Sequence, residues 1–176
     1  IPITDVRVTA GPFYHAQQTN IAYLLKMDPE RLLAPYQREA GLPSTAESYP
    51  NWESTGLDGH IGGHYLTALS LAYAATHDTE ILRRLTYMVN ELDKCQKAHG
   101  NGYLGAVPKG AEVWKQIANG HIEADLFTLN KSWVLWYNLH KVFSGLRDTY
   151  LYTDNQQAKA MLTSFTNWML TLSNKL

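Results

Sequence analysis

The sequence predicts an all-α protein built from stacked helical hairpins. A helix that is apolar on nearly every face, followed by an amphipathic helix, occurs in residues 59–99 and again in residues 131–176. The two helix pairs overlay at an offset of 77 residues, which aligns Leu69 with Leu146 and Tyr73 with Tyr150. These observations indicate a repeated unit of one inner and one outer helix.

Such a unit cannot cover its own apolar faces, so its copies must stack side by side. Continued around a ring, the units form an α/α toroid whose central cavity is lined by the ends of the inner helices. The chain supplies about three hairpins, so we predict roughly half of an (α/α)6 toroid or barrel. Residues 1–176 are then the N-terminal portion of one domain. The chain stops within a helix without a terminal glycine or proline, so we expect the domain to be truncated here.

The first part of the chain alternates turn signals with helical periodicity. We expect a short β-like piece at residues 5–8, closed by Gly11-Pro12, and then helices over His15–Lys26 and Arg31–Glu39. Asp28-Pro29 predicts a helix start, with aspartate as the N-cap and proline in the first turn. Residues 42–51 contain two prolines and two serines without periodicity, which predicts a loop.

The second part carries the two helix pairs. We predict a buried helix over Gly59–Ala75 and an amphipathic helix over Thr79–His99, with Asp78 as the N-cap of the latter. Turns and a short helix near residues 113–119 follow. The second pair is predicted over Lys131–Leu151 and Gln156–Leu176.

Composition excludes several classes of partner. A net charge of -1 provides no basic stripe for nucleic acid. No apolar run approaches the roughly 20 residues that a membrane span needs. Cys95 is the only cysteine, and its helical spacing from Met88 and Leu92 predicts a packing residue rather than a reactive thiol.

The stretch from Asn51 to Tyr65 is the strongest candidate for a functional site. It contains two acidic residues, two histidines, a tryptophan and several glycines at the start of the most apolar helix. Glycine is a poor helix former, so Gly59, Gly62 and Gly63 indicate close approach of backbone or of a ligand. We therefore expect this stretch to form the rim of a pocket.

The order and spelling of several motifs resemble the N-terminal part of glycoside hydrolase family 127 and of the related family 146. The motifs that carry this resemblance span nearly the whole chain: DPERLLA at 28–34, EAGL at 39–42, NWE at 51–53, LDGHIGGHYL at 57–66, GNGYL at 100–104 and WYNLHK at 136–141. The resemblance implies an (α/α)6 catalytic barrel and β-L-arabinofuranosidase activity on plant-type glycans. It also implies a bacterial enzyme of carbohydrate metabolism, periplasmic or secreted rather than cytoplasmic.

The family resemblance also implies a retaining mechanism that uses a cysteine thiolate held on zinc, with further cysteines and glutamates. Those residues lie downstream of the matched region, so we expect zinc in the complete enzyme, no cofactor within this chain and no activity from the isolated chain. Retaining glycosidases of the usual kind need two carboxyl groups about 5 to 5.5 Å apart. Glu53 and Asp58 are the pair available here, but Asp58 is better explained as the cap of the following helix.

His60 and His64 share one helix face at the spacing of zinc-binding pairs. Three interpretations stay open: a metal site, structural histidines, and hydrogen bonding to sugar hydroxyls, which the position at a cavity rim favours. Trp52 can stack on a sugar or plug the helix junction. His140, next to Tyr137 on the second inner helix, is the best single candidate for a substrate contact.

We thus predict substrate-binding roles for six residues: His140, His60, His64, Trp52, Glu53 and Tyr137. The expected partners are a carbohydrate substrate and the remainder of the catalytic domain. The alternative from a different class is a noncatalytic helical module that binds a glycan or a protein.

Overall fold

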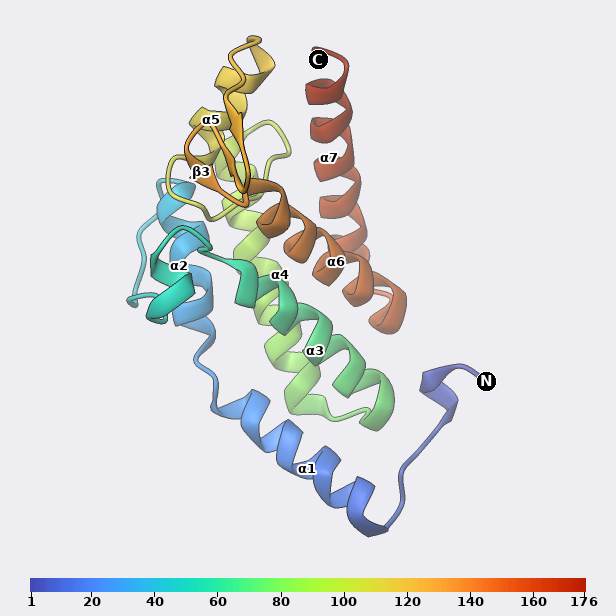
Figure 1. Cartoon of the computed structure of the whole chain (residues 1–176). Helices are drawn as coiled ribbons and strands as arrows, with labels where there is room; N and C mark the ends of the chain where they lie inside the picture. The colour runs from blue at the N-terminus through green and yellow to red at the C-terminus, as the bar shows by residue number, and fades with distance from the viewer.

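A computed structural model describes all 176 residues, and it is mainly helical (Figure 1). Seven α-helices are present: α1 (Gly11–Lys26), α2 (Pro29–Glu39), α3 (His60–Thr76), α4 (Thr79–His99), α5 (Gly110–Ala118), α6 (Leu135–Thr153) and α7 (Gln156–Ser173). Two short 3-10 helices, η1 and η2, cover Ile3–Asp5 and Asn51–Ser54. The predicted fold class is confirmed.

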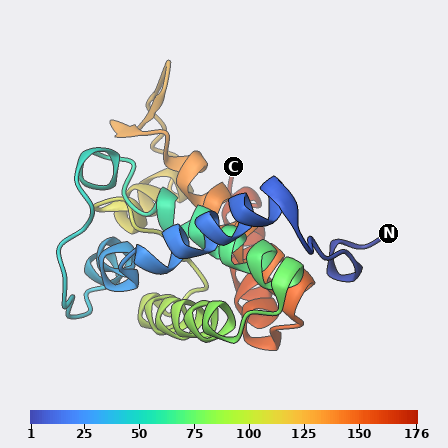
Figure 2. The ribbon, with the colours of Figure 1, turned by 90° about the horizontal axis from the view of Figure 1, so that it is seen from below.

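The helices lie in two layers, and α3–α4 and α6–α7 form helical hairpins. The first layer has α3 between α1 and α6, and the second has α4 between α2 and α7. Seen from below, α1 runs alongside α3 (Figure 2). Each hairpin thus places one helix in each layer, as an α/α repeat requires.

The two helix pairs that the sequence analysis overlaid are equivalent in the structure. Helices α3 and α6 end at Thr76 and Thr153, and α4 and α7 begin at Thr79 and Gln156, so both boundaries keep the 77-residue offset. The hydrophobic core runs between the layers, and Leu69 and Leu146 are both fully buried in it. The predicted repeat therefore describes a real structural unit.

Glycine allows α3 and α6 to pack at very short range. A Cβ atom on Gly63 would lie 2.4 Å from the backbone carbon of Lys141, and one on Gly145 would lie 2.6 Å from the carbonyl oxygen of Gly63. No side chain fits at such distances. The predicted close approach of backbone to backbone at Gly63 is confirmed, and it joins the first turn of α3 to the middle of α6.

Local capping chemistry also follows the prediction. The Asp28 carboxylate accepts a hydrogen bond from the Glu30 N–H, and Asp78 accepts from the N–H groups of Glu80 and Ile81. Pro29 lies in the first turn of α2. These short side chains satisfy backbone donors that a helix start leaves unpaired.

Three expectations need correction. Residues 5–8 form no strand, because Asp5 ends η1 and residues 6–8 have no partner strand to pair with. The helix expected from Lys131 begins at Leu135, and the first helix begins at Gly11 rather than His15. A small antiparallel sheet that the sequence analysis missed precedes α6, with β1 (Ala124–Asp125), β2 (Thr128–Leu129) and β3 (Ser132–Trp133).

The sheet and α5 gather at the end of the molecule where α6 begins and α7 ends (Figure 1). No helix of the structure combines the length and the apolar character needed to cross a membrane. The starts of α3 and α6 hold the residues that the sequence analysis singled out.

Candidate functional site

Glu53 organises the start of α3. Its side chain is fully buried, and its two carboxylate oxygens accept hydrogen bonds of 2.9 Å from the N–H groups of Gly59 and Ile61. Gly59, at the N-cap of α3, has φ of 88°, which is a left-handed conformation. As a glycine it has no side chain that could cap the helix. Glu53 therefore satisfies, from outside the helix, donors that the first turn of α3 leaves free.

This arrangement corrects the role expected for Asp58. The carboxylate of Asp58 accepts a hydrogen bond from Gly56 N–H at 3.0 Å, within the loop, and Gly59 occupies the N-cap position of α3. Burial raises the pKa of Asp58 and that of Glu53. The hydrogen bonds that each carboxylate accepts from backbone N–H groups oppose this increase. Both carboxylates are thus engaged by backbone N–H groups.

Glu53 also fixes the ring of His60. His60 Nδ1 lies 2.6 Å from the Glu53 Oε1 and 2.8 Å from the carbonyl oxygen of Leu57. Both neighbours are acceptors, so Nδ1 must carry the proton. In the neutral imidazole, Nε2 is then left with a lone pair that can accept a hydrogen bond.

Aromatic rings surround His60. The ring centroids of Trp52, His64 and Tyr137 lie 6.1 Å, 6.2 Å and 6.2 Å from that of His60. Trp52 keeps 61% of its surface exposed and Tyr137 keeps 40%. Trp52 thus does not plug the helix junction, and its exposed indole is placed to stack on a ligand beside His60.

His64 lies one turn after His60 on α3 and is exposed. Partial burial lowers the pKa of His64, and the positive charge of Lys141 and the neighbouring His60 and His140 lower it further. The imidazole is therefore neutral at neutral pH, when it offers one donor and one acceptor. That hydrogen-bonding pattern matches a sugar hydroxyl.

The start of α6 supplies the remaining residues of the site. Lys141 Nζ lies 4.5 Å from the centroid of the Tyr137 ring, which is a cation–π contact. His140 is exposed on the same helix and contributes to the electrostatic environment of His64. The structure thus gathers five of the six predicted residues at the starts of α3 and α6: Trp52, His60, His64, Tyr137 and His140, which we call the rim. The sixth, Glu53, is buried and orients His60.

Two residues of this site were missed by the sequence analysis. Asn138 is buried and its Nδ2 donates to the carbonyl oxygen of Asp58 at 2.8 Å, which ties α6 to the loop before α3. Lys141 was not singled out either. The sequence repeat could have identified Lys141, because the 77-residue offset aligns His64 with Lys141 and His60 with Tyr137.

The residues present do not fit a zinc site. No group of three or more His, Cys, Asp or Glu side chains is arranged to hold a metal ion. Burial raises the pKa of Cys95 to about 12, so its thiol stays protonated. Zinc coordination by cysteine requires the thiolate.

The arrangement is suited to binding rather than to acid–base chemistry. It presents exposed aromatic faces beside imidazole and ammonium groups, and its two acids are held by backbone donors. Aromatic faces with a few convergent polar groups are typical of small-molecule sites. A flat ligand face with several hydroxyl groups satisfies both features.

Comparison with known proteins identifies the family of the chain. A search of curated proteins gives no match to the chain. The family model described as "Beta-L-arabinofuranosidase, GH127 catalytic domain" matches residues 5–176. That match covers nearly the whole chain, including both helix starts that form the site, and it makes a carbohydrate the substrate class. The chain therefore belongs to the GH127 β-L-arabinofuranosidase catalytic-domain family of glycoside hydrolases.

Proposed function

We propose that the rim formed by Trp52, His60, His64, Tyr137 and His140 binds an L-arabinofuranosyl unit of a plant-type glycan. The observation that carries this proposal is the orientation of His60, which Glu53 and the Leu57 carbonyl hold in one tautomer beside two exposed aromatic rings. Family membership supports the choice of sugar. A preorganised polar group between aromatic faces binds a sugar with little cost in side-chain entropy.

Each rim residue has a separate task in this proposal. The Nε2 atom of His60 accepts a hydrogen bond from a sugar hydroxyl, and neutral His64 donates or accepts a second one. Trp52 and Tyr137 cover the apolar C–H face of the ring, which is the contact that aromatic side chains make best with sugars. His140 and Lys141 add donors at the open edge.

The bond-breaking step is proposed to depend on residues other than these. A retaining mechanism through a zinc-bound cysteine thiolate needs a ligand set that the present residues do not form. We therefore assign this chain a substrate-positioning part and expect no turnover of arabinofuranosides by the 176-residue chain alone.

A titration with methyl β-L-arabinofuranoside tests the binding role. We expect the indole N–H signal of Trp52 and the imidazole signals of His60 and His64 to shift in a saturable way in NMR spectra of the labelled chain. His60→Ala should weaken binding by about 1 to 3 kcal/mol, because a buried acceptor that meets the sugar is lost. His15→Ala, a change in an exposed histidine of α1 outside the rim, serves as the control.

His140→Ala separates a substrate contact from a core role. We expect weaker binding, again by about 1 to 3 kcal/mol, with an unchanged melting temperature because the side chain is exposed. Wild-type affinity in both histidine variants would contradict the proposed site. Turnover by the purified chain that disappears in Cys95→Ala would instead contradict the positioning role.

A further inference from the structure

The rim is built from two separate pieces of the chain. Trp52, His60 and His64 belong to η2 and the start of α3, whereas Tyr137 and His140 belong to the start of α6. The rings of His60 and Tyr137 meet across this division, with their centroids 6.2 Å apart. A ligand that contacts both rings requires the two pieces to keep one relative position.

The α3 side of the rim is held through the backbone immediately before His60. Glu53 accepts a hydrogen bond from the Gly59 N–H, and the hydroxyl of Tyr36 on α2 donates to the Gly59 carbonyl oxygen at 2.7 Å. A Cβ atom on Gly59 would lie 2.3 Å from that of Ala106, so this backbone is also closely packed. None of these contacts involves α6.

Asn138 makes the connection to α6. Its Nδ2 donates to the carbonyl oxygen of Asp58 at 2.8 Å, and this is the only hydrogen bond between α6 and residues 55–59, the loop before α3. Asp58 lies two residues before His60, and Asn138 directly follows Tyr137. One hydrogen bond thus joins the two pieces beside the two rings that meet.

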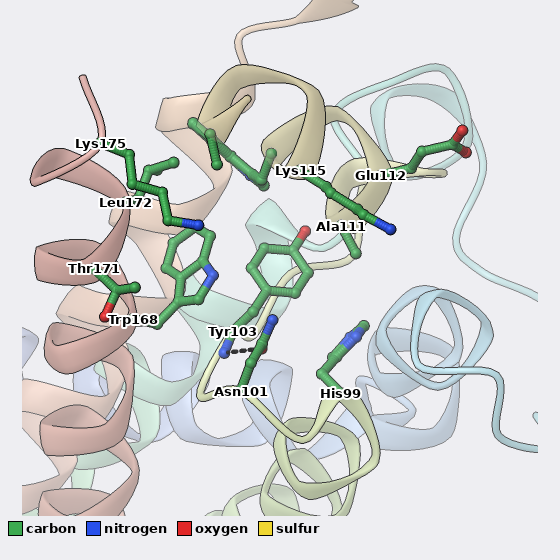
Figure 3. A pocket seen from close by; sticks show the side chains of 12 residues that line it. His99, Asn101, Tyr103, Ala111, Glu112, Lys115, Trp168, Thr171, Leu172 and Lys175 are labelled. Atoms are coloured by element: carbon green, nitrogen blue, oxygen red, sulfur yellow. Dashed lines mark hydrogen bonds between the residues drawn. The ribbon is translucent and has the colours of Figure 1, made fainter. Parts of the chain in front are cut away.

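The side chain of Asn138 is costly to bury. It is 3% exposed, and its Oδ1 is one of five buried side-chain atoms of the chain that have no hydrogen-bond partner. Three others belong to His99, Tyr103 and Trp114, which line a pocket between α4, α5 and α7 that includes no rim residue (Figure 3). Asn138 is the only one of the five on α3 or α6. A buried polar atom without a partner costs stability, so this amide serves something other than the core.

The sequence repeat shows that the fold does not require an asparagine at this place. The 77-residue offset aligns Asn138 with Ile61, which follows His60 as Asn138 follows Tyr137. The apolar side chain of Ile61 packs against the core. An apolar residue is therefore compatible with this position of an inner helix, and the amide is specific to α6.

We propose that Asn138 is a positioning residue that holds Tyr137 and His140 of α6 opposite His60 of α3, so that both sides of the rim meet one sugar. The effect on sugar binding rests on the function proposed for the rim, whereas the effect on the two rings does not. Without Nδ2, the carbonyl of buried Asp58 has no donor, and the loop shifts to find one. His60 then leaves its place opposite Tyr137.

Ring contacts in the free chain test this proposal without a ligand. We expect nuclear Overhauser contacts from His60 to Trp52 and to Tyr137, whose ring centroids lie 6.1 Å and 6.2 Å from its own. Asn138→Leu keeps the branched shape of the side chain and removes the amide. It should weaken the contact between His60 and Tyr137 and leave that between His60 and Trp52, because the latter pair lies on one side of the division.

Thr149→Val is the matched control. Thr149 is a fully buried polar residue of α6 whose Oγ1 accepts a hydrogen bond from Ser70 of α3 at 3.2 Å. It lies about three helical turns after Asn138, away from the rim. The variant should lower the melting temperature while both ring contacts stay. A merely structural role of Asn138 predicts this same result for Asn138→Leu.

Sugar binding gives a second readout. Asn138→Leu should weaken the binding of methyl β-L-arabinofuranoside about tenfold, measured at the imidazole signals of His60 and His64, because the two sides of the rim no longer meet one ligand. Thr149→Val should keep the parent affinity. If the parent chain does not bind the glycoside, the function proposed for the rim fails, and the ring contacts still decide the role of Asn138.

Several outcomes would overturn the positioning role. One is an unchanged contact between His60 and Tyr137 in a folded Asn138→Leu chain, and another is an equal loss of that contact in Thr149→Val. Asn138→Ala cannot overpack the site, so it carries the same expectation if the leucine variant folds poorly. If neither variant folds, Asn138 is a residue of the core and the proposal is contradicted as well.

Discussion

The hairpins α3–α4 and α6–α7 share one turn but begin in different ways. Their inner helices both end in a left-handed residue, His77 with φ of 56° and Asp154 with φ of 52°. Asp78 and Asn155 then cap the outer helices in the same manner. The turn from inner to outer helix thus has nearly the same local structure in both hairpins.

The starts of the two inner helices differ in the structure that precedes them, although Gly59 and Val134 at their N-caps both have a positive φ. Helix α3 follows a 3-10 turn and is capped by buried Glu53, whereas α6 follows a small sheet and the left-handed residue Val134. Aligned positions carry His60 and Tyr137, and then His64 and Lys141. The repeat therefore keeps the shared core and turn, and changes the helix starts to place different functional groups side by side.

The largest expected effects test the shared core. Leu69→Ala and Leu146→Ala should each destabilise the chain by about 2 to 5 kcal/mol, because both side chains are fully buried at aligned positions. Urea unfolding measures the free energies. Leu151→Ala, at a side chain that is 52% exposed, is the control with little expected change. Strongly unequal costs for the two core leucines would show that the hairpins are not equivalent in packing.

The second test concerns the start of α3. Glu53→Gln should cost about 1 to 3 kcal/mol, since one amide group cannot accept every hydrogen bond that the buried carboxylate accepts. The control is Glu47→Gln, at an exposed glutamate away from the start of α3. It should cost less than about 0.5 kcal/mol. Equal losses in thermal unfolding would argue against Glu53 as the organiser of α3.

Val134 supplies a third test, specific to α6. A β-branched residue with φ of 41° is strained, and glycine relieves that strain. Val134→Gly should therefore raise the free energy of unfolding by up to about 1 kcal/mol, offset in part by lost side-chain contacts. Asp154→Gly should gain less, because aspartate tolerates this conformation better. A clear loss of stability in Val134→Gly would mean that the valine side chain contributes more by packing than the strain costs.

The smallest expected effect is a shift in the pKa of His64 on α3 when its neighbour Lys141 on α6 is replaced. The positive charge of Lys141 is one cause of the lowered pKa of His64, so Lys141→Met should move that pKa upward in an NMR titration. Lys159→Met is the matched control, because Lys159 stacks on Tyr150 as Lys141 stacks on Tyr137. An equal response of His64 to both variants would exclude a local effect.

The lowered pKa of His64 also predicts how the stability of the chain changes with pH. Because the folded chain binds a proton at His64 less readily than the unfolded chain does, stability falls as the pH drops below the ordinary value of 6.5. Above that value His64 contributes no pH dependence. Lys141→Met should reduce the loss on the acid side.

Sequence alone was enough for features that depend on neighbours along the chain. Helical periodicity predicted the paired helices, and the short polar side chains Asp28 and Asp78 predicted where outer helices begin, because a cap needs only the next two or three residues. The 77-residue offset followed from the same repeated pattern. Family resemblance added the enzyme class, which the match over residues 5–176 confirmed.

Tertiary structure decided the features that depend on contacts across the chain. Asp58 stood in the sequence as a good cap, yet Glu53 took that role, because the left-handed Gly59 leaves the donors of α3 to a side chain several residues away. Lys141 and Asn138 gained their places from the close crossing at Gly63. The short strands before α6 carry too few residues to show a period, and only pairing with one another defines them.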